Sequence, residues 1–487
     1  MSNSVLKQEG FSIEERVQEL GIQQDRIQFT PDICFLNFND IKMEVVSLSS
    51  FECTVQCNEK QLKEFKAHVL KERSLQAELE FHNQNIQTTT ISWQQTKTAA
   101  LGEGGEVTLE FEVQGEPIQV ERLQAIYAAM NVVTEQKQYA ELQAILPVEF
   151  KNTIYEIRDF LTQLKIKMDK LESETPPDNL EQAQVYRQGI ADTVSAYLLQ
   201  AVPIMNEKAA KSLDGLSEEQ MKAAVQFSRE QIGHLIYGAP FANRAFYKPR
   251  GYAGDYEMMN HLYRNELVGK TLFDQTVHKY LIDEPAGAAV KNRGQYLFGK
   301  IKELFGVTPP DQPLKVISIA SGPAMEQQLF LQHAPEYYGR SAEFTCLDQD
   351  EQSLKHAQKQ LRSLNMAKKS GYVFKFNNMA IKNVIGSGLP QKDYDMIYSA
   401  GLFDYFNEVT SRAAAVKMIA SLKSGGQLVI GNFSKNNPSV PVMELFLDWK
   451  LIYRSEEDLL RIFQGLGSKI WVEKEPLGIN LFVVIQK

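Results

Sequence analysis

Residues 315–325 read Lys-Val-Ile-Ser-Ile-Ala-Ser-Gly-Pro-Ala-Met, and this stretch decides how the last part of the chain folds. The apolar run 316–319 predicts a buried strand, and the small residues Ser321, Gly322 and Pro323 predict a tight turn before a helix. Nucleotide-binding α/β domains open in this way, because small residues let the backbone approach a ligand. We therefore expect such a domain to begin here.

The C-terminal region, residues 301–487, continues with further segments of strand character. They lie at residues 343–348, 372–376, 394–399, 426–433, 469–474 and 481–485. Helical patterns separate the first five strands, which predicts a parallel, doubly wound sheet. Only Glu-Pro-Leu-Gly-Ile-Asn separates the last two, so we expect a closing hairpin with the seventh strand antiparallel. That seven-stranded ending is typical of the Rossmann-like fold of class I S-adenosyl-L-methionine (SAM) methyltransferases rather than of dinucleotide-binding domains.

The totals describe an ordinary globular chain of 487 residues, 43% hydrophobic and 23% charged, long enough for roughly two or three domains. The formal net charge of −9 argues against nucleic acid as a partner. No apolar run is long enough to span a membrane stably, and the N-terminus has no secretory segment. The scattered cysteines and histidines suggest no metal site. We expect a cytoplasmic protein.

The N-terminal region, residues 1–120, is rich in strand patterns and predicts a small β-barrel. These patterns lie at residues 26–30, 33–38, 42–48, 78–81, 88–93 and 107–113, with a helical insertion near 60–72. Residues 51–57 also alternate like a strand, which places Cys53 and Cys57 on one face. We expect these two cysteines to pack in the core rather than to bind a metal.

The central region, residues 121–300, is largely helical. Apolar residues recur at spacings of three and four along one predicted helix, at Ile154, Ile157, Leu161, Leu164, Met168 and Leu171. This row predicts either a core-facing helix or a short coiled coil that would join two copies of the chain. Residues 172–179 predict a linker or turn. A capping box, with Ser217 as N-cap and Gln220 three residues later, opens another helix.

Residues 246–259 read Phe-Tyr-Lys-Pro-Arg-Gly-Tyr-Ala-Gly-Asp-Tyr-Glu-Met-Met. Gly251 and Gly254 permit sharp backbone turns, and aromatic side chains surround Arg250 and Asp255. A segment of this kind is either a plain connection between helices or a lid. The density of hydrogen-bonding aromatic residues favours a lid that closes over a cofactor held at residues 320–322.

Residues 318–324 stand where class I methyltransferases usually have Asp/Glu-x-Gly-x-Gly-x-Gly. Gly322 is kept, Ala320 and Ala324 replace the outer glycines, and Ser318 replaces the acid. Asp348 ends the second strand, where a carboxylate accepts hydrogen bonds from both ribose hydroxyls; its alternative role is that of a helix N-cap.

Asparagines after the third strand are expected to read the adenine edge, and small residues after the fourth to border the transferred methyl group. The expected cofactor-binding residues are Tyr252, Gly254, Asp255, Ala320, Ser321, Gly322, Pro323, Asp348, Gln349, Asn377, Asn378, Met379, Ser399, Ala400 and Gly401.

Four motifs together resemble one bacterial family. They are Lys-Pro-Arg-Gly-Tyr-Ala-Gly-Asp-Tyr-Glu at 248–257, Ala-Ser-Gly-Pro-Ala at 320–324, Ile-Tyr-Ser-Ala-Gly-Leu-Phe-Asp-Tyr at 397–405 and Asp-Trp-Lys-Leu-Ile-Tyr-Arg at 448–454. Over residues 230–487 the chain resembles the extracellular-factor 3-hydroxypalmitic acid methyl ester biosynthesis family. The resemblance implies methyl transfer from SAM to the carboxylate of a 3-hydroxy fatty acid, which gives a diffusible methyl ester signal of the kind used in quorum sensing.

The N-terminal region resembles a degenerate PilZ domain, a barrel that binds cyclic di-GMP. The local cue is Val-Ser-Leu-Ser-Ser-Phe-Glu at 46–52, where PilZ domains have Asp/Asn-x-Ser-x-x-Gly. Ser47 and Glu52 replace the acid or amide and the glycine, and the expected arginine pair is missing. A carboxylate at this place would repel phosphate, so cyclic di-GMP is not expected to bind.

A carboxylate acceptor is ionised at neutral pH and needs no general base. Arg250 is expected to hold it through paired donors, with Arg454 as the alternative. Tyr256 and Tyr405 are expected to line the acceptor and sulfonium pocket. Two other functions stay open: an N- or O-methyltransferase of another small metabolite, with His261 or Tyr256 as base, and a non-catalytic, SAM-binding regulatory protein.

Overall fold

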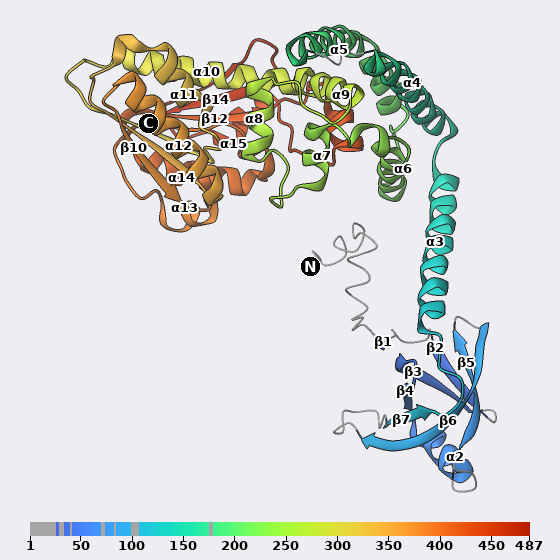
Figure 1. The fold of residues 1–487 in the computed structure, drawn as a ribbon. Coiled ribbons are helices and arrows are strands. Elements are labelled where there is room, and N and C mark those ends of the chain that lie inside the picture. The colour runs from blue at the N-terminus through green and yellow to red at the C-terminus, as the bar shows by residue number, and fades with distance from the viewer. Residues whose placement is uncertain are drawn as a thin grey trace. The chain divides into compact units, whose positions relative to one another are not determined.

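The computed structural model describes residues 26–28, 34–38, 41–69, 74–81, 84–98, 107–174 and 179–487. The chain forms two compact units, Met1–Ala140 and Glu141–Lys487, and each is described by itself (Figure 1). Several predicted segments lie outside the described residues: the N-terminus, strand residues 29–30 and 33, the last residues of the 60–72 helix, and residues 175–178 of the linker. The three-part division at residues 120 and 300 stays a prediction.

The N-terminal unit is a closed antiparallel barrel, as the sequence predicted. Its strands are β1 (Arg26–Gln28), β2 (Cys34–Phe38), β3 (Ile41–Ser49), β4 (Glu52–Cys57), β5 (Leu75–Phe81), β6 (Gln84–Thr98) and β7 (Val107–Val113). Six of them close the barrel in the order β3-β2-β5-β6-β7-β4, in which β4 pairs again with β3, and β1 also pairs with β3. Cys53 and Cys57 are both buried in the barrel core, which confirms the packing role expected of them.

Helix α2 (Glu59–Val69) lies against the barrel through Phe65. The Phe65 ring makes edge contacts at 5.4 Å with the rings of Phe38 and Phe111. The first residues of helix α3 (Val120–Ile145) join the same core. The barrel is thus filled with side chains, which leaves its outer surface for any partner.

The helical part of the second unit begins with α4 (Val148–Ser173), α5 (Leu180–Lys211) and α6 (Glu218–Ile236). The Ser217–Gln220 capping box is present as predicted. Within the apolar row of α4, Ile154, Ile157, Leu161 and Met168 are buried. The helix packs on α5, α6 and α9 (Leu272–Asp283) of the same chain. The row is therefore used inside the chain, and a dimer through this region would need another surface.

The sheet of the second unit has the order β10-β9-β8-β11-β12-β14-β13. Its strands are β8 (Leu314–Ile319), β9 (Ala342–Asp348), β10 (Val373–Asn378), β11 (Tyr394–Ser399), β12 (Leu422–Phe433), β13 (Lys469–Lys474) and β14 (Asn480–Gln486). β14 is antiparallel to both of its neighbours, and the strands from β10 to β12 are parallel. The predicted parallel sheet and closing hairpin are confirmed, and the arrangement is consistent with a class I methyltransferase fold.

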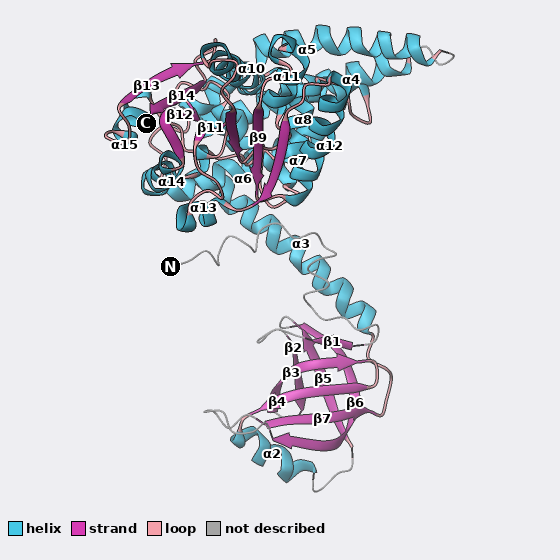
Figure 2. Cartoon of the chain, turned by 90° about the vertical axis from the view of Figure 1, so that its left-hand side faces the viewer, coloured by secondary structure: helices cyan, strands magenta, loops and turns pink. Residues whose placement is uncertain are grey.

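Helices cover both faces of this sheet (Figure 2). One core lies under α10 (Pro285–Val307), α11 (Met325–His333) and α12 (Glu351–Lys368). The other lies under α13 (Ile381–Ser387), α14 (Glu408–Ala420) and α15 (Glu456–Phe463). After β8 the chain adds β9 and β10 on one side of β8 and then returns to place β11 on its other side. The carboxyl ends of these strands therefore flank the crevice where open α/β sheets bind ligands.

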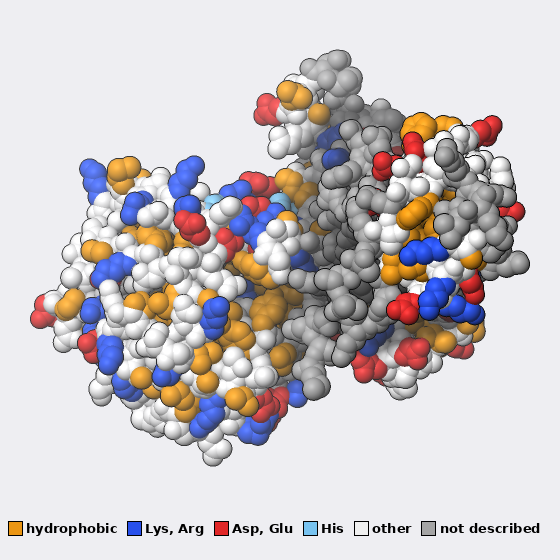
Figure 3. Space-filling model, turned by 90° about the horizontal axis from the view of Figure 1, so that it is seen from below, with side chains coloured by type: hydrophobic (Ala, Val, Ile, Leu, Met, Phe, Trp, Pro, Cys, Tyr) orange, Lys and Arg blue, Asp and Glu red, His pale blue; other side chains and the backbone are white. Residues whose placement is uncertain are grey.

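Among the described residues, no helix is long and apolar enough to cross a membrane. In the space-filling view, Lys and Arg side chains are interspersed with Asp and Glu side chains (Figure 3).

Arg454 joins three segments near the carboxyl edge of the sheet. It is 3% exposed, and its guanidinium donates at 2.8 Å to the carbonyl oxygen of Phe403 and also to Phe406 O and Asn432 Oδ1. With these donors committed to the chain itself, Arg454 fastens the segment after β11 to β12.

Replacing Arg454→Met should lower the free energy of unfolding by about 3 kcal/mol, because three buried oxygen acceptors lose their donors. Urea unfolding followed by circular dichroism measures the change. Arg461→Met is the matched control, since Arg461 pairs with Glu408 on an exposed surface and its loss should leave the midpoint unchanged. An unaltered midpoint for Arg454→Met would contradict this structural role.

Candidate active site

The turn after β8 keeps a left-handed backbone although two of its glycines are alanines. Ala320, Gly322 and Ala324 have φ values of +53°, +53° and +52°. Non-glycine residues adopt this region at a cost of about 1 kcal/mol or more each, so the surrounding contacts must hold the turn. A Cβ placed on Gly322 would meet no described atom within 4 Å, so the turn borders open space.

Two predicted residues of the turn are bonded to the chain itself. Ser321 N donates at 3.1 Å to Leu347 O of the neighbouring strand. The carbonyl oxygen of Pro323 accepts from Gln328 Nε2 at 2.7 Å. These bonds fix the turn between β9 and the first turn of α11.

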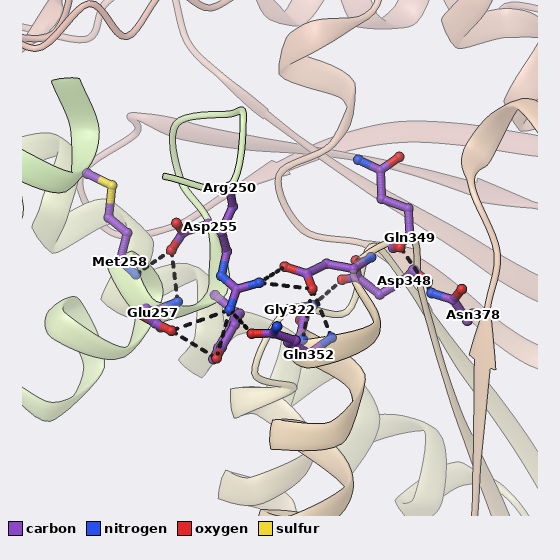
Figure 4. A network of polar contacts seen from close by, with 12 residues as sticks. Arg250, Asp255, Glu257, Met258, Gly322, Asp348, Gln349, Gln352 and Asn378 are labelled. Carbon is purple, nitrogen blue, oxygen red and sulfur yellow. Dashed lines mark hydrogen bonds and ion pairs between the residues drawn. The ribbon is translucent and has the colours of Figure 1, made fainter. Parts of the chain in front are cut away.

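Asp348 lies at the end of β9, beside this turn (Figure 4). Its Oδ2 accepts from Gly322 N and its Oδ1 from Asp350 N, both at 2.9 Å. Burial is the main cause of its raised pKa. Each carboxylate oxygen keeps a second acceptor position. The N-cap of α12 is Asp350, whose Oδ1 accepts from Gln352 N and Ser353 N, so Asp348 does not serve as the cap.

Sequence reasoning missed Glu326, a buried acid beside the position where the motif lacks one. Its carboxylate is 5% exposed, accepts from the Tyr398 hydroxyl at 2.6 Å and lies 3.5 Å from Ser318 Oγ. Burial raises its pKa. Ser318 thus contacts a carboxyl group that comes from α11 rather than from β8. Its only signal in the sequence is its place in the first turn of that helix.

The last residues of β10, with Met379 directly after them, hold the end of β9 in place. Asn378 Nδ2 donates to the carbonyl oxygens of Asp348 and Gln349, at 3.1 and 3.0 Å, and Met379 N donates to Asp348 O at 3.0 Å. Asn377 is half-buried beside them, and Gln349 is exposed. An adenine-reading role for this group stays a prediction, with the donors of Asn378 already committed.

The segment after β11 lies across from the turn. Ser399 Oγ donates to Ile319 O at 3.1 Å and so ties the ends of β11 and β8 together. Ala400 O accepts from Arg293 Nη1 at 3.4 Å. A Cβ on Gly401 would come within 2.5 Å of the same nitrogen, so this segment closely approaches helix α10.

The loop between α7 (Pro240–Tyr247) and α8 (Tyr256–Arg264) adopts left-handed conformations at Lys248, Gly251 and Gly254. Asp255 is the N-cap of α8 and accepts from Glu257 N and Met258 N at 3.0 Å. It also accepts from Arg244 Nε at 2.7 and 2.8 Å. Asp255 therefore holds the loop, and its carboxylate faces the chain rather than an open space.

Arg250 reaches from this loop to the N-terminus of α12 (Figure 4). Its Nη1 lies 3.0 and 3.2 Å from the carboxylate oxygens of Asp350, and its guanidinium stacks 4.7 Å above the Tyr256 ring. It also bonds Gln352 and lies 3.5 Å from Glu257. The carboxylates of Asp350 and Glu257 therefore already face the charge of Arg250. Its expected role of holding the acceptor stays a prediction.

The other side of the loop is held from the segment after β11. The Tyr405 hydroxyl donates to Ala253 O at 3.2 Å and accepts from Trp449 Nε1 at 2.9 Å. A Cβ on Gly254 would meet the Trp449 ring at 2.9 Å. Since Tyr405 follows β11 and Asp350 follows β9, the loop crosses the carboxyl end of β8, which lies between them.

A cleft of about 620 Å³ opens where the loop meets α12. Its lining is formed by Arg244, Pro249, Arg250, Tyr252, Glu257, Gln349, Asp350 and Gln352. Burial and the nearby carboxylates of Asp348 and Asp350 raise the pKa of Tyr252, so its hydroxyl stays protonated at neutral pH and can donate a hydrogen bond. The structure thus brings together the predicted loop, the turn and the end of β9.

No protein-family model matches this sequence, and no curated protein matches it. Solved structures resemble it at low identity. A carbon methyltransferase, CurJ, is 14% identical with a TM-score of 0.36, over 68% of this chain and 98% of that chain. Magnesium protoporphyrin IX methyltransferase from Synechocystis PCC 6803, bound to SAH, is 13% identical with a TM-score of 0.33, over 47% and 93%.

A Bordetella parapertussis chain described as a possible exported protein is 12% identical, with a TM-score of 0.38, over 61% of this chain and 96% of that chain. No residue role or substrate is transferred from these proteins. The strand order and its closing hairpin are the basis on which the fold is assigned to the class I methyltransferase type.

Asp350→Asn should loosen the loop, because the amide keeps the helix cap but cannot form the ion pair with Arg250. Trypsin cleavage after Arg250 should become about tenfold faster, which corresponds to a loss of about 1.4 kcal/mol from the free energy that holds the loop in place. The rate is followed through the fragment that begins at Gly251. Glu351→Gln is the matched control, since Glu351 pairs only with Lys355 on the exposed helix surface. Equal rates for both variants would disprove the fastening role of Arg250.

Proposed function

We propose that this chain is a SAM-dependent methyltransferase whose acceptor is the carboxylate of a small apolar acid, such as a 3-hydroxy fatty acid. The observation that carries the proposal is the arrangement at the carboxyl edge of the sheet. There the left-handed turn is bonded to the carboxylate of Asp348, and the two residues that follow Asp348 line a cleft together with a loop held down on both sides. The resemblance to the extracellular-factor family supports the acceptor class.

The residues present fit the cofactor. Asp348 has two unused acceptor positions for ribose hydroxyls, and open space borders Gly322, where a backbone-bound ligand would lie. The aromatic faces of Tyr405 and Trp449 would attract a sulfonium cation. When bound, SAM supplies an electrophilic methyl group. The chain's own residues would orient the acceptor for in-line displacement and exclude water.

The acid–base groups near the loop favour an acceptor that is already ionised. Burial, followed by Arg244 and Arg264, lowers the pKa of His261, which makes it a weak base. Burial and Glu257 raise the pKa of Tyr256, so its hydroxyl is not ionised at neutral pH. An amine or alcohol acceptor would need such a base, whereas a carboxylate does not. The methylation of another small metabolite is therefore the second candidate.

An apolar cavity of about 30 Å³ lies on the far side of Trp449. Its lining includes Leu262, Val290, Met443 and Leu447. The cavity has room for about one water molecule, so an apolar acceptor chain would have to displace a side chain such as that of Met443, which adapts its shape readily.

For the barrel we propose a PilZ-like docking role without cyclic di-GMP, since Glu52 stands exposed at the place of the family's glycine.

Titration with SAM tests the proposal first. Asp348→Ala should weaken SAM binding at least about tenfold, because two charge-assisted hydrogen bonds to ribose are lost. Asp311→Ala, an exposed residue at the opposite end of β8, should bind as the wild type does. Binding is measured by calorimetry after circular dichroism has shown that both variants are folded. Wild-type protein that fails to bind SAM would rule out both enzymatic functions.

SAM binding should weaken on acidification, and the loss should begin at a higher pH than it would with a carboxylate of ordinary pKa. Burial raises the pKa of Asp348 above 3.8, and only its ionised form accepts both ribose donors. Affinity should therefore be full above the raised pKa and fall as the pH is lowered through it. The same titration repeated with Asp348→Asn should lose this pH dependence. A dependence that persists in Asp348→Asn would assign it to another group.

The acceptor class is tested by incubating the protein with a bacterial lipid extract and SAM that carries a radiolabelled methyl group. A carboxylate acceptor yields a methyl ester, so the label should be released as methanol by mild base. Asp348→Ala protein is the control and should transfer little label. Label that survives base treatment would favour the second candidate, an N-methylated or ether product.

A further inference from the structure

Arg293 is a buried arginine whose donors are poorly used. It lies on α10 and is 7% exposed. Its Nη1 lies 3.4 Å from Ala400 O, and its Nη2 lies 3.6 Å from Met259 Sδ. Its Nε is buried and finds no hydrogen-bond partner among the residues that the structure describes. The Tyr263 hydroxyl is a further hydrogen-bonding neighbour. A guanidinium carries five N–H donors, so these contacts leave at least Nε without an acceptor and no donor facing a carboxylate oxygen directly.

The neighbouring acids do not pair with it directly. The charge of Arg293 acts to lower the pKa of both Asp404 and Glu326, but within the described part of the chain no carboxylate forms an ion pair with it. Asp404 accepts from Phe433 N at 2.6 Å, and Glu326 accepts from Tyr398. Burying a cation without a direct partner is costly unless a ligand completes the site.

The other arginines around the site have direct partners within the chain. Arg250 pairs with Asp350, Arg244 with Asp255 and Arg229 with Asp448. Arg454 donates to three oxygen atoms of the chain. The two arginines that the sequence predicted as acceptor clamps therefore already bind groups of the chain, whereas Arg293 has no ion pair among the described residues, and its Nε is buried without an acceptor.

Arg293 lies between the segment after β11 and helices that border the apolar cavity. Its Nη1 lies against the segment after β11, where Gly401 leaves room for it. One helical turn away on α10, Val290 lines the apolar cavity, and on α8 the cavity residue Leu262 lies one turn from Met259. The guanidinium is thus within one helical turn of residues that line the cavity.

We propose that Arg293 forms a carboxylate-binding subsite at the carboxyl end of β11, occupied by the carboxylate of the acceptor. The assignment rests on the proposed function. An arginine fits a carboxylate through two parallel donors, and its weak internal contacts leave those donors available. The methionine carboxylate of SAM offers the same chemistry from a second source, so the experiment has one arm for each.

The variants are Arg293→Met, which removes the donors, and Gly401→Ala, whose Cβ pushes the guanidinium out of place while its charge remains. Arg293→Lys keeps the charge but loses the paired donors. Lys300→Met is the matched control on the same helix, because Lys300 pairs with Glu303 and Glu473 away from the site. Circular dichroism and thermal melting accompany every variant.

The first arm compares 3-hydroxypalmitate with its neutral methyl ester in the presence of SAH. An acceptor subsite predicts that Arg293→Met and Gly401→Ala weaken binding of the acid about tenfold or more and leave binding of the ester unchanged. The second arm compares SAH with 5′-methylthioadenosine, which lacks the amino-acid carboxylate. If the subsite holds the cofactor, the preference for SAH should shrink by a similar factor instead. Lys300→Met should match the wild type in both arms.

Stability separates this role from a structural one. Arg293→Met gives up no ion pair among the described residues, so its melting temperature should equal or exceed that of the wild type, whereas a structural arginine would lower it. Wild-type affinities in both arms, or unfolding of all three site variants, would overturn the assignment while leaving the proposed function intact. Failure of the wild type to bind SAH would refute the proposed function as well.

Discussion

The hydrogen bonds of Asp348 organise the edge of the sheet on which the rest of the site depends. One carboxylate oxygen accepts from the turn after β8, and the other from the start of α12. Asp350, which that second bond positions, in turn holds Arg250 of the loop. The turn, the strand end, the helix and the loop are therefore connected through successive contacts. Asp348 lies in the middle of this series of contacts. A ligand that bonds to Asp348 would therefore also affect the position of the loop, through Asp350 and Arg250.

Charge is distributed unevenly around this edge. Arg244 and Arg250 face Asp255, Glu257 and Asp350, so the charged groups around the cleft carry an excess of negative charge. Arg293, buried on α10, has no comparable partner among the described residues. An anionic group would thus gain little beside the paired arginines and more beside Arg293.

The fold could be predicted closely from the sequence because its signals are local. Buried strands with helical patterns between them set the parallel sheet, and a short connection before the last strand sets the hairpin. The site was predicted only in outline. The sequence indicates that Asp348 and Arg250 matter, but not that Arg250 would pair with Asp350, because the two residues are 100 positions apart. Glu326 and Arg293 were missed for the same reason, since each sits in an ordinary helical pattern.

The depleted turn motif shows how such distant contacts compensate for a local loss. Ala320 and Ala324 adopt the left-handed conformation that glycine takes more easily, and the bonds of Ser321 to Leu347 and of Gly322 to Asp348 hold them there. The missing acid at Ser318 is likewise matched by a carboxyl group from the next helix. The neighbouring strand supplies hydrogen bonds that hold the turn in the conformation that glycines would adopt more easily. The following helix supplies the carboxyl group that the motif lacks at Ser318.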